Sequence, residues 1–253
     1  MITNQDIEII LGFTMTEFKL RFRNAYFGYI WSILNPLLML STLYIIFSYV
    51  VKLEIPNYRL FLLIGIISWN FFSDATTKSL NFLIGNSSLL LRHKLSPAIF
   101  VVSSCLSSFI IYLLNFFVFI ALAAFLGLKF NILNFISIFY ILLLFFFSLG
   151  ISMILVVIYS YFKDIIHIWS FLLLIGFWIS PIIYSELVIP IELRGVYMLN
   201  PIARIIIHMR NLFIYSYLDT FSQCVITFIL VILTLYIGFA LLSRFNSGFG
   251  ERL

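Results

Sequence analysis

Long apolar runs constrain this chain more than any other feature of its sequence. Of its 253 residues, 63% are hydrophobic and only 10% are charged, and the mean hydropathy is +1.15. A water-soluble domain cannot bury that much apolar surface. Because a helix needs about 20 residues to cross the hydrocarbon core of a bilayer, the runs predict an all-α, polytopic membrane protein with about six transmembrane helices.

Short polar segments separate the predicted spans. We expect a single domain over residues 1–253, with a six-span bundle in residues 33–242. Pro97 can begin the third span because the first turn of a helix tolerates proline. The fifth span breaks at Pro181, and residues 184–223 are too interrupted to cross yet too apolar for a free loop. This segment therefore predicts short re-entrant helices on the outer side, between the fifth and sixth spans.

An amphipathic pattern precedes the first span. Apolar residues recur at helical spacing here, and most charged residues fall between them; the apolar set is Ile7, Ile10, Leu11, Met15, Phe18 and Phe22. The pattern predicts an interface helix within residues 3–24, lying in the plane of the membrane surface. Such a helix can be a plain anchor or a contact for a partner, and the pattern favours neither.

The distribution of positive charge predicts the orientation. Nine of the 15 Lys and Arg residues fall on the side of the N-terminus and six on the other, which favours both termini inside the cell. The net charge of +5 suits a protein held against anionic membrane lipids and does not indicate nucleic-acid binding. Three arginines of the outer segment, Arg194, Arg204 and Arg210, are expected to face an aqueous vestibule or an anionic substrate rather than lipid.

Several chemistries lack their sequence signatures. The printed sequence has no GxxxxGK[ST] phosphate loop for ATP binding. It also has no G-x-S-x-G or H-E-x-x-H motif of a hydrolase and no metal-ligand cluster. The acids lie near span ends, which disfavours proton-coupled transport. The three histidines are scattered, and we expect them at interfaces rather than as catalytic bases. We therefore predict no catalytic, cofactor or metal residues in this chain, and either its energy comes from a partner or the protein is passive.

Thirty Phe and 14 Tyr exceed the number needed to anchor spans at the bilayer surface. They can serve helix packing and lipid contact, or they can line a path for an amphiphilic substrate. The composition favours the first interpretation and leaves the second open.

The stretch from Arg21 to Pro36 passes from a basic, water-facing segment into the first span. Arg21 and Arg23 can bind lipid phosphates, or they can meet the phosphate of an anionic, lipid-linked substrate. A second basic cluster follows the second span and consists of Arg92, His93 and Lys94. It is an inside-positive signal, and it can also belong to a loop on which a partner docks.

These residues occur in an ordered set of motifs. The first is the basic segment followed by Phe27-Gly28, Trp31 and Pro36, and later ones are Gly65, Trp69, Phe71-Phe72-Ser73, Asn86, Leu89, Lys94, Pro97, Phe162-Lys163-Asp164, Ser180-Pro181-Ile182-Ile183-Tyr184 and Leu199-Asn200-Pro201. The order resembles that of ABC-2 type permeases that export polysaccharides such as O-antigen, capsule and teichoic acid. Lys163 departs from the arginine usual in that family.

The resemblance implies the transmembrane subunit of an ATP-driven exporter of a lipid-linked, O-antigen-type polysaccharide in the bacterial inner membrane. It implies pairing with a second copy and with two separate ATP-binding subunits, which bind ATP and Mg. Arg21, Arg23, Tyr26 and Trp31 would form the substrate entrance, residues 92–94 the ATPase docking loop, and Tyr184, Arg204 and Arg210 the outer gate. Alternatives are an ABC-2 exporter of teichoic acid, lipid or drug, or a membrane enzyme acting on polyprenyl-linked sugars. The enzyme should show clustered acids and histidines, which this chain lacks.

Overall fold

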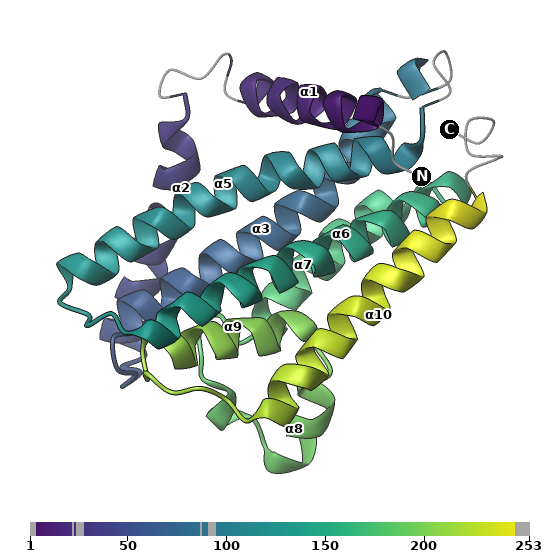
Figure 1. Cartoon of the computed structure of the whole chain (residues 1–253). Coiled ribbons are helices and arrows are strands. Elements are labelled where there is room, and N and C mark those ends of the chain that lie inside the picture. The colour runs from purple at the N-terminus through teal and green to yellow at the C-terminus, as the bar shows by residue number, and fades with distance from the viewer. Residues whose placement is uncertain (1–3, 22, 24–27, 87, 91–94, 246–253) are drawn as a thin grey trace.

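The computed structural model describes residues 4–21, 23, 28–86, 88–90 and 95–245. Those residues form helices joined by short turns, with no strand among them, which confirms the all-α prediction (Figure 1). In chain order the elements are α1 Asn4–Leu20, α2 Ile30–Tyr44, the π-helix η1 Ile45–Val50, α3 Tyr58–Gly85, α5 Pro97–Phe125, the 3-10 helix η2 Ile132–Ile136, α6 Ser137–Tyr161, α7 Ile165–Ile179, the 3-10 helix η3 Glu186–Val188, α8 Ile191–Tyr197, α9 Pro201–Phe213 and α10 Phe221–Phe245.

Five helical segments of the described chain are long and apolar enough to cross a membrane; they are Ile30–Val50, Tyr58–Gly85, Pro97–Phe125, Ile132–Tyr161 and Phe221–Arg244. The predicted fifth span is α7, which has only 15 residues. At 1.5 Å per residue it is about 22 Å long, shorter than a hydrocarbon core of about 30 Å. The chain nevertheless passes from the end of the bundle that carries α1 to the opposite end that carries α8 (Figure 1). A short helix and the turns after it therefore make this passage.

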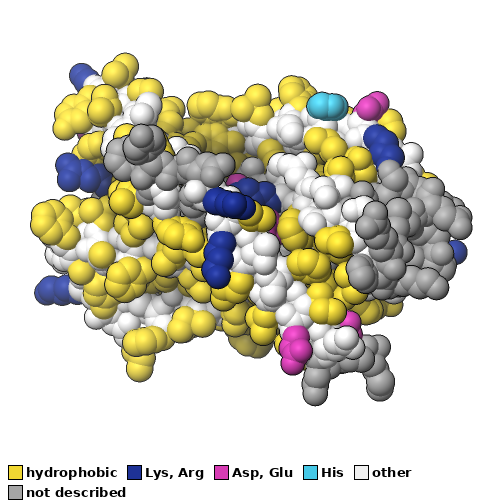
Figure 2. Space-filling view, turned by 90° about the horizontal axis from the view of Figure 1, so that it is seen from above, with side chains coloured by type: hydrophobic (Ala, Val, Ile, Leu, Met, Phe, Trp, Pro, Cys, Tyr) yellow, Lys and Arg dark blue, Asp and Glu magenta, His cyan; other side chains and the backbone are white. Residues whose placement is uncertain are grey.

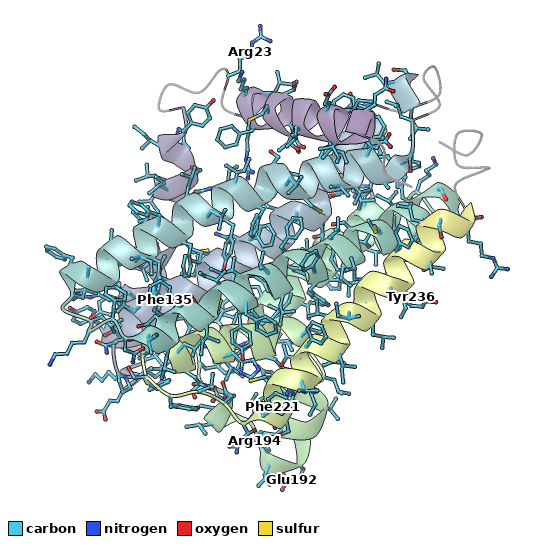
Figure 3. The ribbon with its side chains drawn as sticks, in the orientation of Figure 1. Arg23, Phe135, Glu192, Arg194, Phe221 and Tyr236 are labelled. Carbon is cyan, nitrogen blue, oxygen red and sulfur yellow. The ribbon has the colours of Figure 1, made fainter. Side chains whose placement is uncertain are left out.

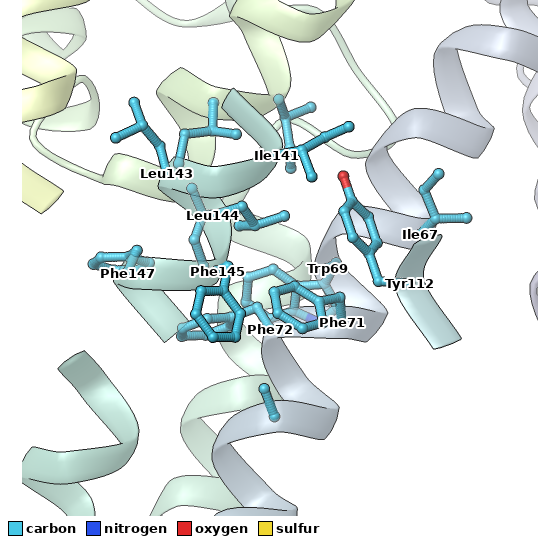
Figure 4. Close-up of a cluster of buried hydrophobic side chains, with 14 of the residues drawn as sticks. Ile67, Trp69, Phe71, Phe72, Tyr112, Ile141, Leu143, Leu144, Phe145 and Phe147 are labelled. Carbon is cyan, nitrogen blue, oxygen red and sulfur yellow. The ribbon is translucent and has the colours of Figure 1, made fainter. Parts of the chain in front are cut away.

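Helices α3 and α6 form the centre of the bundle. In the apolar part of α3, 78% of the residues are buried, and in that of Ile132–Tyr161, which contains α6, the share is 72%. The corresponding share for Ile30–Val50 is 17%. Aromatic rings fill the space between α3, α5 and α6 (Figure 4). Phe72 stacks on Phe147 with ring centroids 5.5 Å apart, and Phe71 lies 5.0 Å from Tyr112. These contacts show that aromatic side chains serve helix packing, as the composition favours.

Helix α1 lies across one end of the bundle (Figure 1). Phe13 stacks on Phe100 of α5 with centroids 5.2 Å apart, and the Ser104 hydroxyl donates to Glu17 at 2.9 Å. Burial raises the pKa of Glu17 above its ordinary value, and the bond from Ser104 offsets part of that rise. Another face of α1 carries three large apolar side chains that are each about half exposed, Ile7, Leu11 and Met15. The predicted helix is thus confirmed, with one face on α5 and an apolar stripe left uncovered.

The outer segment contains two short helices, as predicted. Helix α9 begins with Pro201 in its first turn and with Asn200 as its cap, whose side chain accepts from the Ile202 N–H at 3.1 Å. Every residue from 202 to 213 is buried, and α9 packs against α3, α6 and α10. Its backbone ends are therefore covered by protein, which is the condition for a short helix at membrane depth.

Arg210 fastens α9 to two other parts of the chain. Arg210 is 1% exposed, and the Cζ atom of its guanidinium lies over the Phe61 ring, 3.3 Å from the ring centroid. It donates to the carbonyl oxygens of Phe61 at 2.9 and 3.1 Å and of Ile182 at 2.9 Å, and also to that of Pro181. The expectation that Arg210 faces an aqueous vestibule is therefore wrong, because backbone carbonyls of the same chain take its donors.

Arg204 is also turned inward, contrary to the same expectation. It is 4% exposed and donates to Thr227 at 2.8 Å, to the carbonyls of Met198 and Gln223 at 3.1 Å, and to the Gln223 side chain. The third arginine, Arg194, is half-buried and donates to two carbonyls near η3.

His208 completes this buried network. It lies 2.5 Å from Asp219 and 2.9 Å from Thr227, and the ring of Tyr140 stacks on it. Partial burial alone would raise the pKa of Asp219, but hydrogen bonds from His208 and Asn211 hold it below its ordinary value. His208 is therefore buried, whereas the sequence suggested an interface position. The network ties α9 to α10 through hydrogen bonds.

Helices α6 and α10 meet backbone to backbone. A Cβ added at Gly238 would lie 2.5 Å from the carbonyl oxygen of Gly150, and one added at Gly150 would lie 2.9 Å from the backbone of Leu235. Small residues allow such close approach, which supplies packing energy where lipid offers no hydrophobic driving force.

We predict that Gly238→Ala destabilises the protein by about 1–3 kcal/mol, because the added methyl forces α10 away from α6. Gly12→Ala on α1 is the matched control, since no atom lies within 4 Å of its added Cβ and alanine favours a helix. The free energy of unfolding, measured by detergent-denaturant titration of the purified chain, checks the prediction. Equal stability of the two variants would contradict it.

A second prediction concerns Arg210→Met, which should lower the free energy of unfolding by about 2–4 kcal/mol. The substitution leaves the buried carbonyls of Pro181 and Ile182 without donors and removes a second donor from that of Phe61, and each unpaired buried group is costly. Arg194→Met, at a half-buried position, serves as the control and should cost less. A variant as stable as the wild type would show that the turn at residues 180–182 does not depend on this side chain.

Candidate functional site: a polar pocket between α2, α3 and α5

A pocket of about 540 Å³ opens between α2, α3 and α5 and extends toward the α1 end of the bundle. We call it the polar pocket; its lining is Arg21, Trp31, Ser32, Asn35, Pro36, Met39, Ile67, Asn70, Phe71, Ser73, Asp74, Ser108, Ile111, Tyr112 and Asn115. The bilayer crosses the same three helices, so a concentration of amides and hydroxyls at this depth is unusual. Polar groups inside a membrane bundle generally serve function.

Charged residues gather at the α1 end of the polar pocket. Asp74 of α3 accepts from Arg21 and, at 3.2 Å, from Lys78 one turn further along the same helix. The side chains of these three residues are between 20% and 39% exposed, so water reaches them. Figure 2 views this end of the molecule and shows basic side chains near the middle of the face. Glu17 of α1 also interacts with Arg21 and Lys78, so two cations and two carboxylates meet at this end of the pocket. Arg21 and Lys78 are the groups to which an anion would bind here.

The structure brings together two of the four predicted entrance residues. Arg21 and Trp31 both line the polar pocket. Gly28, two residues before α2 begins, has a φ of +47°, a conformation that glycine adopts without strain. Arg23 is exposed, does not line the pocket and points away from the bundle (Figure 3). Tyr26 lies outside the described residues.

The predicted docking residues Arg92, His93 and Lys94 also lie outside the described residues. The helices that flank them do not. Helix α5 begins at Pro97, and Phe82 of α3 and Phe100 of α5 both contact the ring of Phe13 on α1. The interface helix and the two helix ends that border the predicted loop therefore meet at one end of the bundle.

The three predicted gate residues lie toward the other end. Tyr184 is half-buried, and its hydroxyl donates to the carbonyl oxygen of Ile179 at 2.6 Å, which closes the end of α7. Arg204 and Arg210 are held by backbone carbonyls and do not line the polar pocket. Arg194 and Glu192 mark the α8 end of the molecule in Figure 3. A second hollow, of about 580 Å³, lies at the turn between η1 and α3.

Sequence reasoning missed four uncharged polar residues of the polar pocket, Asn35, Asn70, Ser108 and Asn115. Their signal was an amide or hydroxyl inside an apolar run, but only the fold shows that four such positions from three helices face one space. Among the described residues no group of three or more His, Cys, Asp and Glu side chains could hold a metal ion.

Comparison with known proteins identifies the family of this chain. Residues 10–214 match the family model described as ABC-2 type transporter. The chain is 28% identical over 251 residues to an O-antigen export system permease protein RfbA of Klebsiella pneumoniae, covering 97% of this chain and 95% of the relative. It is 26% identical over 230 residues to the polysialic acid transport protein KpsM of Escherichia coli, covering 90% and 89%. The family model spans most of the chain, so this protein belongs to the ABC-2 type transporter family.

Proposed function

We propose that this chain is the transmembrane subunit of an ATP-driven exporter that carries a lipid-linked polysaccharide across the bacterial inner membrane. It would act with a second copy of itself and with two ATP-binding subunits, and both of its termini would face the cytoplasm. Relatives with near full-length similarity are named as permeases for O-antigen and for polysialic acid. The two names specify different cargoes, but both cargoes are polysaccharides.

The observation that carries the proposal is the polar pocket with its charged mouth. An amphiphilic cargo that pairs an anionic headgroup with sugars needs a cationic site at the membrane surface and uncharged polar groups deeper in the bundle. Arg21 and Lys78 supply the first, and the amides of α2, α3 and α5 supply the second. A carrier for purely apolar molecules would have no use for these groups, because their burial costs free energy.

The arrangement of the α1 end supports the partnership with an ATP-binding subunit. The chain contains no phosphate loop, so another subunit must bind ATP. Helix α1, the end of α3 and the start of α5 form one continuous surface around Phe13. A motor subunit seated there would push on α3 and α5, two walls of the polar pocket. ATP binding would then change the shape of the path directly.

The proposal is tested by co-expression with the ATP-binding protein encoded nearest to this chain. The two should co-purify in equal amounts, and the lipid-linked polysaccharide fraction of the same cells should change the rate of ATP hydrolysis. A chain that purifies alone, or a complex whose hydrolysis ignores that glycolipid, would overturn it.

In that complex, Arg21→Ala should raise the glycolipid concentration that gives half-maximal stimulation by about tenfold. Hydrogen bonds to charged groups are worth about 1.5–3 kcal/mol, and Arg21 is the cation that lines the polar pocket. Arg23→Ala is the matched control, because Arg23 is exposed and does not line the pocket. Co-purification should be unchanged in both variants; its loss with Arg21→Ala would assign the residue a structural role instead.

A further inference from the structure

The part of the polar pocket away from its charged mouth contains amides that the protein itself does not use. Asn35 of α2 is exposed and Asn70 of α3 is half-buried; both line the pocket, and neither makes a side-chain hydrogen bond among the described residues. Asn115 of α5 donates through its amide nitrogen to the Ile111 carbonyl at 3.0 Å, and no described residue donates to its amide oxygen. Each of these amides therefore has a donor or an acceptor available to a ligand in the pocket.

Ser108 is an independent observation of the same kind. Its side chain is 2% exposed and lines the pocket, yet its hydroxyl has no hydrogen-bond partner among the described residues. Four other buried serines of α3, α5 and α6 donate to the carbonyl four residues earlier, at 2.7 to 2.8 Å; they are Ser79, Ser103, Ser148 and Ser152. The Ser68 hydroxyl of α3 also lacks a partner among the described residues, but Ser68 does not line the pocket. Ser108 therefore does not make the hydrogen bond to the carbonyl four residues earlier, and its hydroxyl is available at the pocket wall.

The chemistry of these groups defines the ligand class. An amide presents both a donor and an acceptor, and a hydroxyl does the same, so the set matches a molecule with several hydroxyl groups. The aromatic rings of Trp31, Phe71 and Tyr112 also line the pocket and offer flat apolar walls. Among the described residues that line the pocket, the one cation is Arg21 at the mouth, where Asp74 engages it. The volume of about 540 Å³ lies within the range of about 300–1,000 Å³ typical of small-ligand pockets.

We propose that the inner part of the polar pocket binds an uncharged sugar ring directly, through Asn35, Asn70, Ser108 and Asn115. The proposal rests on the proposed function, and it deepens it by separating two subsites. The anionic headgroup engages Arg21 at the mouth, and a neutral sugar of the same cargo occupies the amide-lined part. Ser108 acts as a contact to the sugar rather than as a part of the fold.

Ser108→Ala tests this role because binding and stability should respond differently. Removing an unpaired buried hydroxyl leaves no partner unsatisfied, so the complex should be at least as thermostable as the wild type. The glycolipid concentration for half-maximal stimulation of ATP hydrolysis should nevertheless rise about fivefold, as expected for one lost hydrogen bond. Ser170→Ala, at an exposed position of α7, is the matched control and should change neither quantity. An unchanged half-maximal concentration for Ser108→Ala would overturn the proposal.

Photo-crosslinking identifies what occupies the pocket. The crosslinking amino acid p-benzoylphenylalanine replaces Met39, which lines the pocket, or Leu38, its exposed neighbour on α2. In cells that export the polymer, irradiation should attach carbohydrate to the chain at position 39 and not at position 38. Capture of lipid alone, or of no carbohydrate at position 39, in a complex that still responds to glycolipid would overturn the sugar subsite and leave the exporter intact. A wild-type complex without that response would instead overturn the proposed function itself.

Discussion

Hydrocarbon offers no hydrogen-bond partner to a peptide group, and the rest of this structure depends on that constraint. Helices satisfy it along the spans, since each backbone donor finds its acceptor four residues earlier. The difficulty arises where the chain must stop being helical at membrane depth, after α7 and around α9. There the protein uses arginine side chains as backbone donors. Arg210 serves the carbonyls of Phe61, Pro181 and Ile182, and Arg204 serves those of Met198 and Gln223.

The same constraint separates structural polar groups from functional ones. Around α9 nearly every polar atom finds a partner within the chain, as in the group formed by His208, Asp219 and Thr227. In the polar pocket, by contrast, the half-buried Asn70 amide and the buried Ser108 hydroxyl have no partner among the described residues. Both sets carry a desolvation cost, but only the first recovers it by stabilising the fold. The second recovers it when a ligand binds.

Much of the fold was predictable from the sequence because a membrane-spanning helix appears there as an apolar run of about 20 residues. The third span, which the sequence predicts to begin at Pro97, is the helix Pro97–Phe125. Length also shows why α7 differs, since Pro181 ends it early. The functional residues were harder to predict from the sequence. Arg210 could not be distinguished from a vestibule-facing arginine, because its partners Phe61 and Ile182 contribute carbonyls, and a carbonyl has no signature in a sequence.

The division of the polar pocket into a charged mouth and an uncharged interior fits the demands on a polymer exporter. A strong anion site placed deep in the path would hold a charged cargo and slow its movement, since charge interactions strengthen as the dielectric constant falls. At the mouth, where Arg21 and Asp74 are partly exposed, solvent weakens the same interaction and allows release. Amide and hydroxyl contacts deeper inside are individually weak and tolerate different sugars. Such an arrangement selects the cargo where it enters and stays permissive along the path that each following sugar must take.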